Sequence, residues 1–371
     1  MKNKLTLFGL VFVLLMLPVI AACAQEAPAP APAPAPAPVT VTAPASAPET
    51  VTAPAPAPVT VTAPAPVAPI EITWVTWMDS NHPDFWEFEQ YKKMVEGKSN
   101  GRLVFKYLGG NEVSPKKEQD SAVRRGIIDA TFTYSSGSED LVPGIDLVSL
   151  SKISPEEERA VGFIDELDRR AQEVGLKFLG RLELADGYSA MATNKRIEKR
   201  ADFEGVSIAI GGGWKVAAFA AIGMPAIAVS SVDFYSALDT GVVDSVQRSP
   251  GGIMQMKLYE VTDYMFPHVF WTGSGVGLMN LDKWNSLPKE LQDVMIEAKL
   301  ELQPISLAGY ADRVKKAQEE WIAGGAQLLP PLSQADQDWF FTTLYGAAWE
   351  DRAKQLPELA AKYKDVLVPP K

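Results

Sequence analysis

Hydrophobic and polar positions change their period several times beyond residue 70. Residues 71–76 and 103–107 are short runs rich in β-branched and aromatic side chains, which is typical of strands. Apolar residues recur at helical spacing over 84–96 between them, and a second helix over 115–125 precedes a strand over 127–134. This alternation predicts an α/β fold with a mostly parallel sheet covered by helices.

The same alternation returns further along the chain. Strands are predicted over 177–182, 189–193, 206–210, 226–229, 244–247, 268–271 and 276–280, and helices over 215–221 and 231–241. Ser286 is predicted to cap a long helix that reaches about residue 322 with a kink at Pro304. Ser333 is predicted to cap a further helix through residue 344. The region with this alternating pattern is long enough to form two lobes.

The N-terminus follows a different pattern. Lys2 and Lys4 precede an almost unbroken apolar run, which ends in small residues directly before Cys23. This order is typical of an export signal, so residues 1–22 are expected to be a lipoprotein signal peptide. The run is too short for a membrane-spanning anchor and no charges follow to stop transfer. Cys23 is the only cysteine, and its position resembles that of an acylated lipoprotein cysteine. We therefore expect a lipid anchor on the cell membrane and an extracytoplasmic location, in the periplasm or at the cell surface.

Residues 23–68 form a Pro/Ala-rich segment with little charge and no aromatic side chain. Such a composition buries too little apolar surface to fold, and alternating prolines favour an extended polyproline II conformation. We expect a disordered linker, which is either a stalk that lifts the domain off the membrane or an inert spacer.

Charge and motif content argue against several functions. The net charge of -11 does not suit a nucleic-acid-binding protein. The only histidines, His82 and His268, lack metal-ligand spacing and are expected to be structural. Glu183 and Asp186 could in principle serve glycoside hydrolysis, but acidic pairs are common on surfaces. We therefore expect a binding protein rather than an enzyme, with no cofactor and no metal.

Five segments resemble, in order and spacing, motifs of the DctP-type substrate-binding proteins of TRAP transporters. They are Tyr-Leu-Gly-Gly-Asn at 107–111, Gly-Ile-Ile-Asp-Ala at 126–130, Asp-Phe-Glu-Gly at 202–205, Ile-Gly-Met-Pro at 222–225, and the run 233–244. The resemblance implies a periplasmic-binding-protein-like fold, in which two α/β lobes are joined by hinge strands and a long C-terminal connecting helix. It also implies the permease subunits of an ion-gradient-driven transporter as partners.

The resemblance also sets the expected domains. Residues 69–187 and 275–318 are expected to form lobe I, and residues 188–274 and 319–371 lobe II. A binding protein for an ATP-driven importer, a sensor component and, less favoured, an exported hydrolase remain alternatives.

The expected ligand site lies at the ends of strands, where loops and helix starts converge. Family members hold a substrate carboxylate with an arginine at the position that corresponds to Ala209, and some have a second at the position of Ser189. Arg248 either compensates by holding an acid or amide oxygen or is a solvated rim residue. Gln247 beside it offers a donor and an acceptor.

Aromatic residues at strand exits complete the candidate site, and each is either a ligand contact or ordinary core packing. They are Trp77, Tyr134, Tyr188, Trp214 and Trp271. Trp214 follows three glycines, which let the backbone approach a ligand closely. The missing arginines and the many aromatics predict a small organic acid or an aromatic, hydroxylated or amide-bearing molecule, bound by lobe closure.

Overall fold

The computed structural model describes residues 68–182, 184, 188–273 and 275–368. They belong to one compact unit, residues 65–371. The predicted signal peptide, the predicted linker apart from its last residue, the predicted lipidation site Cys23, and the pair Glu183 and Asp186 lie outside the described residues. Within the described part, the helices are too short or too polar to cross a membrane.

The first sheet has the strand order β2-β1-β3-β10-β4. Its strands are β1 (Ile70–Thr76), β2 (Leu103–Gly109), β3 (Ala130–Tyr134), β4 (Leu176–Arg181) and β10 (Gly275–Asn280). The first three are mutually parallel, and β10 runs antiparallel to β3 and β4. Its core is aromatic: the buried ring of Trp74 stacks on Phe105 at 4.8 Å and lies 5.5 Å from Phe88. The alternating strands and helices predicted here are confirmed.

Helices cover this sheet. They are α1 (Phe85–Lys98), α2 (Lys116–Arg124), α3 (Pro155–Ala160), α4 (Phe163–Glu173) and α8 (Leu281–Ser286), with the 3₁₀ helix η1 (Ile145–Leu150). The first two were predicted, and α3, α4 and α8 were not. Ser286 is the last residue of α8, so its predicted capping role is wrong: Pro288 is the N-cap residue of the long helix that follows.

The second sheet has the order β11-β9-β5-β8-β6-β7. Its strands are β5 (Ala190–Thr193), β6 (Ile208–Ile210), β7 (Ala226–Ala228), β8 (Ser245–Arg248), β9 (Tyr264–Met265) and β11 (Gln327–Leu328). The helices around it are α5 (Lys215–Ala221), α6 (Phe234–Asp239) and α7 (Pro250–Gln255), with η2 (Arg200–Phe203), η3 (Ser231–Asp233) and η4 (Leu258–Glu260).

The strand predicted over 268–271 is wrong. The strand in this region is β9, and Phe270 makes only an isolated bridge to Ser189. Trp271 has a positive φ of 54°, which a bulky residue rarely adopts and which interrupts an extended backbone.

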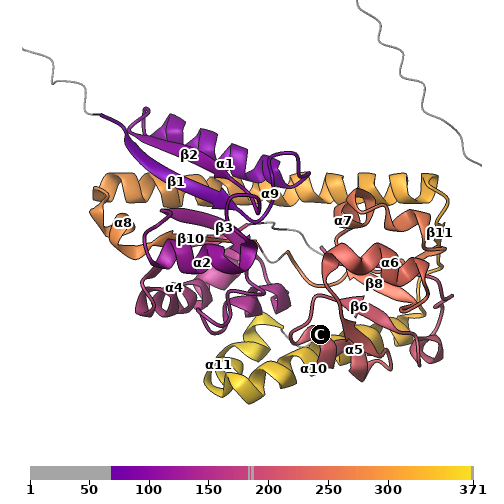
Figure 1. The fold of residues 1–371 in the computed structure, drawn as a ribbon. Helices are drawn as coiled ribbons and strands as arrows, with labels where there is room; N and C mark the ends of the chain where they lie inside the picture. The colour runs from indigo at the N-terminus through magenta and orange to yellow at the C-terminus, as the bar shows by residue number, and fades with distance from the viewer. Residues whose placement is uncertain (1–67, 183, 185–187, 274, 369–371) are drawn as a thin grey trace, which may run out of the picture. The chain divides into compact units, whose positions relative to one another are not determined.

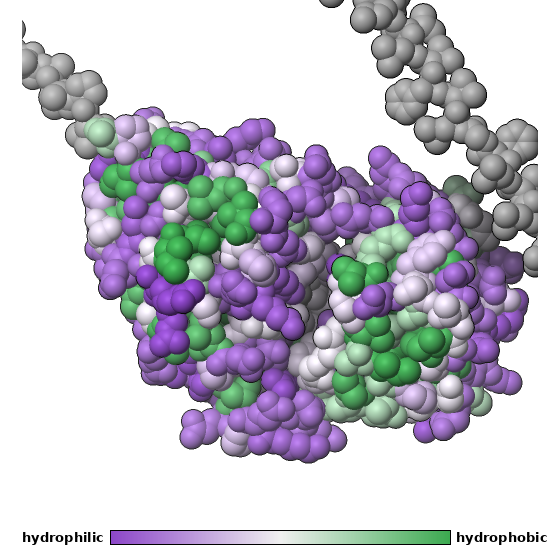
Figure 2. All heavy atoms as spheres, viewed as in Figure 1, coloured by the Kyte–Doolittle hydropathy of each residue, from purple (hydrophilic) through white to green (hydrophobic). Residues whose placement is uncertain are grey.

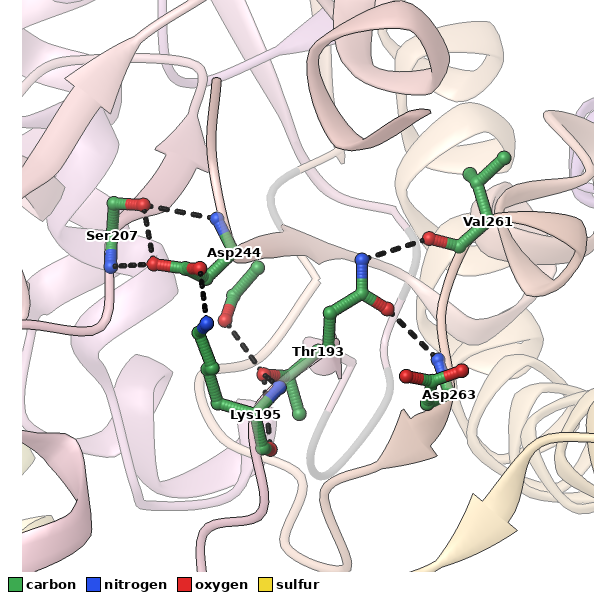
Figure 3. A network of polar contacts seen from close by, with 8 residues as sticks. Thr193, Lys195, Ser207, Asp244, Val261 and Asp263 are labelled. Carbon is green, nitrogen blue, oxygen red and sulfur yellow. Dashed lines mark hydrogen bonds and ion pairs between the residues drawn. The ribbon is translucent and has the colours of Figure 1, made fainter. Parts of the chain in front are cut away.

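The same corner occurs once in each sheet. Asp129 follows Gly-Ile-Ile and Asp244 follows Gly-Val-Val, and each glycine has a φ near 70°. The Asp244 carboxylate accepts hydrogen bonds from the Ser207 amide (3.0 Å) and hydroxyl (2.8 Å), as Figure 3 shows. Asp129 accepts the corresponding bonds from Thr73, both 2.7 Å long. In each of these two motifs, an aspartate directly before one strand thus holds the backbone of a neighbouring strand or of the residue that precedes it.

Two segments connect the sheets where the chain crosses between them. The Leu182 amide bonds to the Gly275 carbonyl at 2.7 Å, and the Tyr188 amide to the Trp271 carbonyl at 2.8 Å, so the described ends of the two segments are paired. The 35-residue helix α9 (Lys289–Ala323), which includes Pro304, passes along α1 and then α7 (Figure 1). The two-lobed α/β fold with a long connecting helix is therefore confirmed.

The C-terminal helices pack against both lobes. Ser333 caps α10 (Gln334–Gln355) by accepting a hydrogen bond from the Asp336 amide, as predicted, and α10 packs on α5. The unpredicted α11 (Pro357–Leu367) reaches the first lobe, where the Tyr363 ring lies 5.1 Å from Phe163. The exact lobe boundaries remain a prediction.

Candidate ligand-binding cleft

A cavity of about 590 Å³ lies between the two lobes. The space-filling view shows a recess between the two halves of the folded unit (Figure 2). Six of the seven predicted ligand contacts line the cavity: Tyr134, Tyr188, Trp214, Gln247, Arg248 and Trp271. Trp77 does not line it, contrary to the expectation, because it packs behind Tyr134 with ring centroids 4.2 Å apart.

A glycine turn and two indoles form part of the lobe II wall. Gly212 and Gly213 adopt φ values of 94° and 70°, which side-chain-bearing residues rarely tolerate. The turn brings Trp214 to the cavity, where its ring meets that of Trp271 edge-on at 4.8 Å. Both rings are almost fully buried, so this part of the wall is apolar.

Lys215 is a cavity residue that sequence reasoning missed. It is half-buried at the start of α5, with its ammonium 5.9 Å from the Trp214 ring centroid and 5.7 Å from that of Trp271. Burial and, to a lesser extent, repulsion by Arg248 lower its pKa to about 8. The available signal was its place next to Trp214, which follows the glycine turn, but a lysine at a helix start usually indicates a solvated surface.

Ala209 and Ser189, which the resemblance predicts to correspond to family arginines, lie in different environments. Ala209 is fully buried on β6 in an apolar cluster with Ala190 and Val246, and it does not line the cavity. Ser189 does line the cavity, and its hydroxyl accepts a 2.8 Å hydrogen bond from Gln247. This hydrogen bond fixes the Gln247 amide beside Ser189 in the cavity wall.

The lobe I wall carries acidic and basic groups together. Asp120 on α2 lines the cavity beside Glu139, Lys116 and Lys117. Its Oδ2 accepts a 2.5 Å hydrogen bond from the Ser138 hydroxyl, whereas its buried Oδ1 has no hydrogen-bond partner among the described residues. Burial raises the pKa of Asp120 to about 6, although Ser138 and Lys116 act in the opposite direction. The buried charge therefore costs stability at neutral pH.

Replacing Asp120 with asparagine is expected to stabilise the protein by about 1–3 kcal/mol at pH 7. The folded pKa lies above the ordinary aspartate value of 3.8, so the folded state holds the proton more tightly and loses stability as pH rises through about 6. The variant removes this loss and keeps an acceptor for Ser138. Urea unfolding of the wild type and the variant at pH 4.5 and pH 7 measures the difference in their free energies of unfolding. Glu118→Gln on the exposed face of α2 is the control, and an equal gain in both variants at pH 7 would contradict the prediction.

Both histidines accept hydrogen bonds from backbone amides. His82 Nδ1 accepts from the Asp84 amide and His268 Nε2 from the Leu332 amide, each at 3.1 Å. Burial, then repulsion by Arg248, lowers the pKa of His82 to about 4, so this ring is neutral at pH 7. Within the part of the chain that the structure describes, His, Cys, Asp and Glu form no cluster suited to a metal ion.

The comparisons with known proteins identify the family. The family "Bacterial extracellular solute-binding protein, family 7" (DctP) matches residues 75–348. The chain belongs to this family, and the DctP resemblance of its motifs is confirmed.

Solved TRAP periplasmic solute-binding proteins share the fold. A Desulfovibrio salexigens protein with bound orotic acid has a TM-score of 0.69 and 24% identity, covering 80% of this chain and 97% of that one. An apo open structure from Rhodobacter sphaeroides has a TM-score of 0.71 and 19% identity, covering 80% and 98%. These likenesses concern the fold.

Among curated relatives, a monocarboxylate 2-oxoacid-binding periplasmic protein of Nostoc sp. is 28% identical over 172 residues, or 44% of this chain and 47% of the relative. Sequences from Haemophilus influenzae match over a longer stretch, about two thirds of their own length; one is 24% identical over 217 residues, which are 57% of this chain and 66% of the relative. Their names give no activity, and the activity of this chain is a proposal.

Proposed function

We propose that the protein is the extracytoplasmic receptor of a TRAP-type transporter, which captures a small organic acid by closing two lobes over it. One observation carries the proposal: among the described residues, the interlobe cavity is lined by aromatic rings and by four basic and two acidic side chains. Such a cavity favours a small anion with an apolar or planar part. Solved relatives of this fold include one with bound orotic acid, which supports an acid as the ligand.

We also propose an extracytoplasmic location with a lipid anchor at Cys23. The support is the apolar run and the small residues before this cysteine, together with family membership. The proposed partners are the membrane permease subunits, to which the closed receptor delivers its ligand. Lobe closure distinguishes the loaded receptor from the empty one for the permease, because the ligand stabilises a closed state that is less populated when the cavity is empty.

Calorimetry of the purified full-length protein tests the proposal with orotate, pyruvate, benzoate and succinate. At least one monocarboxylate is expected to bind with a micromolar or lower Kd, and its binding is expected to reduce the radius of gyration in solution scattering. Arg248→Ala is expected to weaken that binding. Tight binding of succinate that is unaffected by Arg248→Ala, or turnover of any of these compounds, would contradict the proposal.

A further inference from the structure

The basic side chains of the cavity are distributed unevenly between its walls. On lobe I, Lys116 and Lys117 lie near Asp120 and Glu139. On lobe II, Lys215 and Arg248 are the basic lining residues, and the described lining of that lobe contains no acidic side chain. The lobe II wall therefore carries positive charge that its own residues do not balance.

Lys215 and Arg248 act on each other without a shared counter-ion. Neither forms an ion pair with any described residue, and the buried Nε of Arg248 has no hydrogen-bond partner there. Repulsion by Arg248 contributes to the lowered pKa of Lys215, whereas Glu139 across the cavity raises it less strongly. Two half-buried like charges are unfavourable unless an anion lies between them.

The surroundings of the pair define the shape of that anion. The Lys215 ammonium lies within 6 Å of the ring centroids of both Trp214 and Trp271. Gln247 lies directly before Arg248 on β8 and adds a polar group to the cavity. An acid group at the two cations would thus place the rest of a small molecule against the indoles.

Resting on the proposed function, we propose that Lys215 is the specificity-determining residue of the cleft, anchoring the ligand's carboxylate together with Arg248. The resemblance predicts a family arginine at the position of the buried Ala209, and we infer that this pair takes over its role. The bound molecule is a monocarboxylate whose acid end faces lobe II and whose planar or apolar part packs on Trp214 and Trp271. An ammonium near two indoles recognises the negative charge of the ligand but, unlike a guanidinium, imposes no bidentate geometry on it.

The test compares each of three acids, orotate, pyruvate and benzoate, with its primary amide by calorimetry. In the wild type an acid is expected to bind at least roughly tenfold more tightly than its amide. Lys215→Met is expected to weaken the acid by roughly 10- to 100-fold and to leave the amide almost unchanged. Lys93→Met, which removes an exposed lysine of α1, is the control for lost surface charge. Thermal unfolding of each variant verifies that it is folded.

A pH series separates an anchoring charge from a merely structural lysine. Wild-type affinity for the acid is expected to fall above about pH 8, as Lys215 loses its proton. Lys215→Arg is expected to retain affinity at pH 9, because an arginine stays charged. The other charged groups that face the cavity, Arg248, Lys116, Lys117, Asp120 and Glu139, are unchanged in this comparison.

The outcomes distinguish this inference from the proposed function. If none of the acids binds the wild type, the proposed function fails and this inference fails with it. If an acid binds but Lys215→Met retains its affinity, or if Lys215→Arg shows the wild-type pH profile, the anchoring role is wrong while the receptor function stands.

Discussion

Replacing Arg181 with methionine is expected to lower the free energy of unfolding by about 3–5 kcal/mol. Arg181 is 3% exposed at the end of β4 and forms an ion pair with Glu158, which is completely buried. Its guanidinium also donates to the Thr272 hydroxyl at 2.6 Å and the Gly273 carbonyl at 3.2 Å. The variant leaves the Glu158 carboxylate buried without its partner, which is the costly case for a buried pair.

The same substitution removes the hydrogen bonds that hold Thr272 and Gly273 in the second segment that connects the lobes. Thr272 and Gly273 directly follow Trp271, so Arg181 fixes the backbone that presents this indole to the cavity. Ligand affinity is therefore expected to fall together with stability, and urea unfolding and calorimetry measure the two effects. Arg181 is thus expected to link the fold of lobe I to the geometry of the site.

The control for this prediction is Arg169→Met on α4. Arg169 also contacts two carboxylates, Glu166 and Glu173, but its side chain is half exposed. Exposed pairs contribute less than about 1 kcal/mol. Similar losses in the Arg181 and Arg169 variants would show that burial of the pair is not what matters.

Replacing Gly110 with alanine is expected to cost about 2–3 kcal/mol. A Cβ at this position would lie 2.7 Å from the Met78 carbonyl carbon and 2.9 Å from the Asp79 amide nitrogen. Both are backbone atoms, so a rotamer change cannot relieve the clash and the two loops must separate. Asn111 next to it donates a 2.6 Å hydrogen bond to the Trp77 carbonyl, which the separation would weaken.

Gly97→Ala is the matched control for this prediction. Gly97 lies within α1 with no atom near the site of a Cβ, so alanine there is expected to stabilise by about 0.5–1 kcal/mol. Thermal unfolding midpoints measure both variants. A neutral Gly110→Ala variant would show that the loop after β2 can move freely away from the loop after β1.

Much of the fold could be predicted because its signals are local. The β-branched and aromatic run at 70–76 and the helical periodicity of 85–98 follow from neighbouring residues, and the structure contains both elements. The helix α11 was not predicted, although its buried side chains Leu359, Tyr363 and Leu367 recur at helical spacing; the face that they form packs on the first lobe, where Tyr363 meets Phe163. The strand predicted over 268–271 failed because the backbone turns at Trp271 to cross between the lobes.

By itself, the sequence determined the class of fold, the family motifs and most of the aromatic residues that line the cavity, because periodicity, turn glycines and strand exits are properties of short segments. Only the tertiary structure decided that Trp77 lies behind Tyr134, that Asp120 is buried in the cavity wall, and that Lys215 joins Arg248. These features depend on burial and on charges brought together from distant parts of the chain. A residue's neighbours along the chain do not specify that environment.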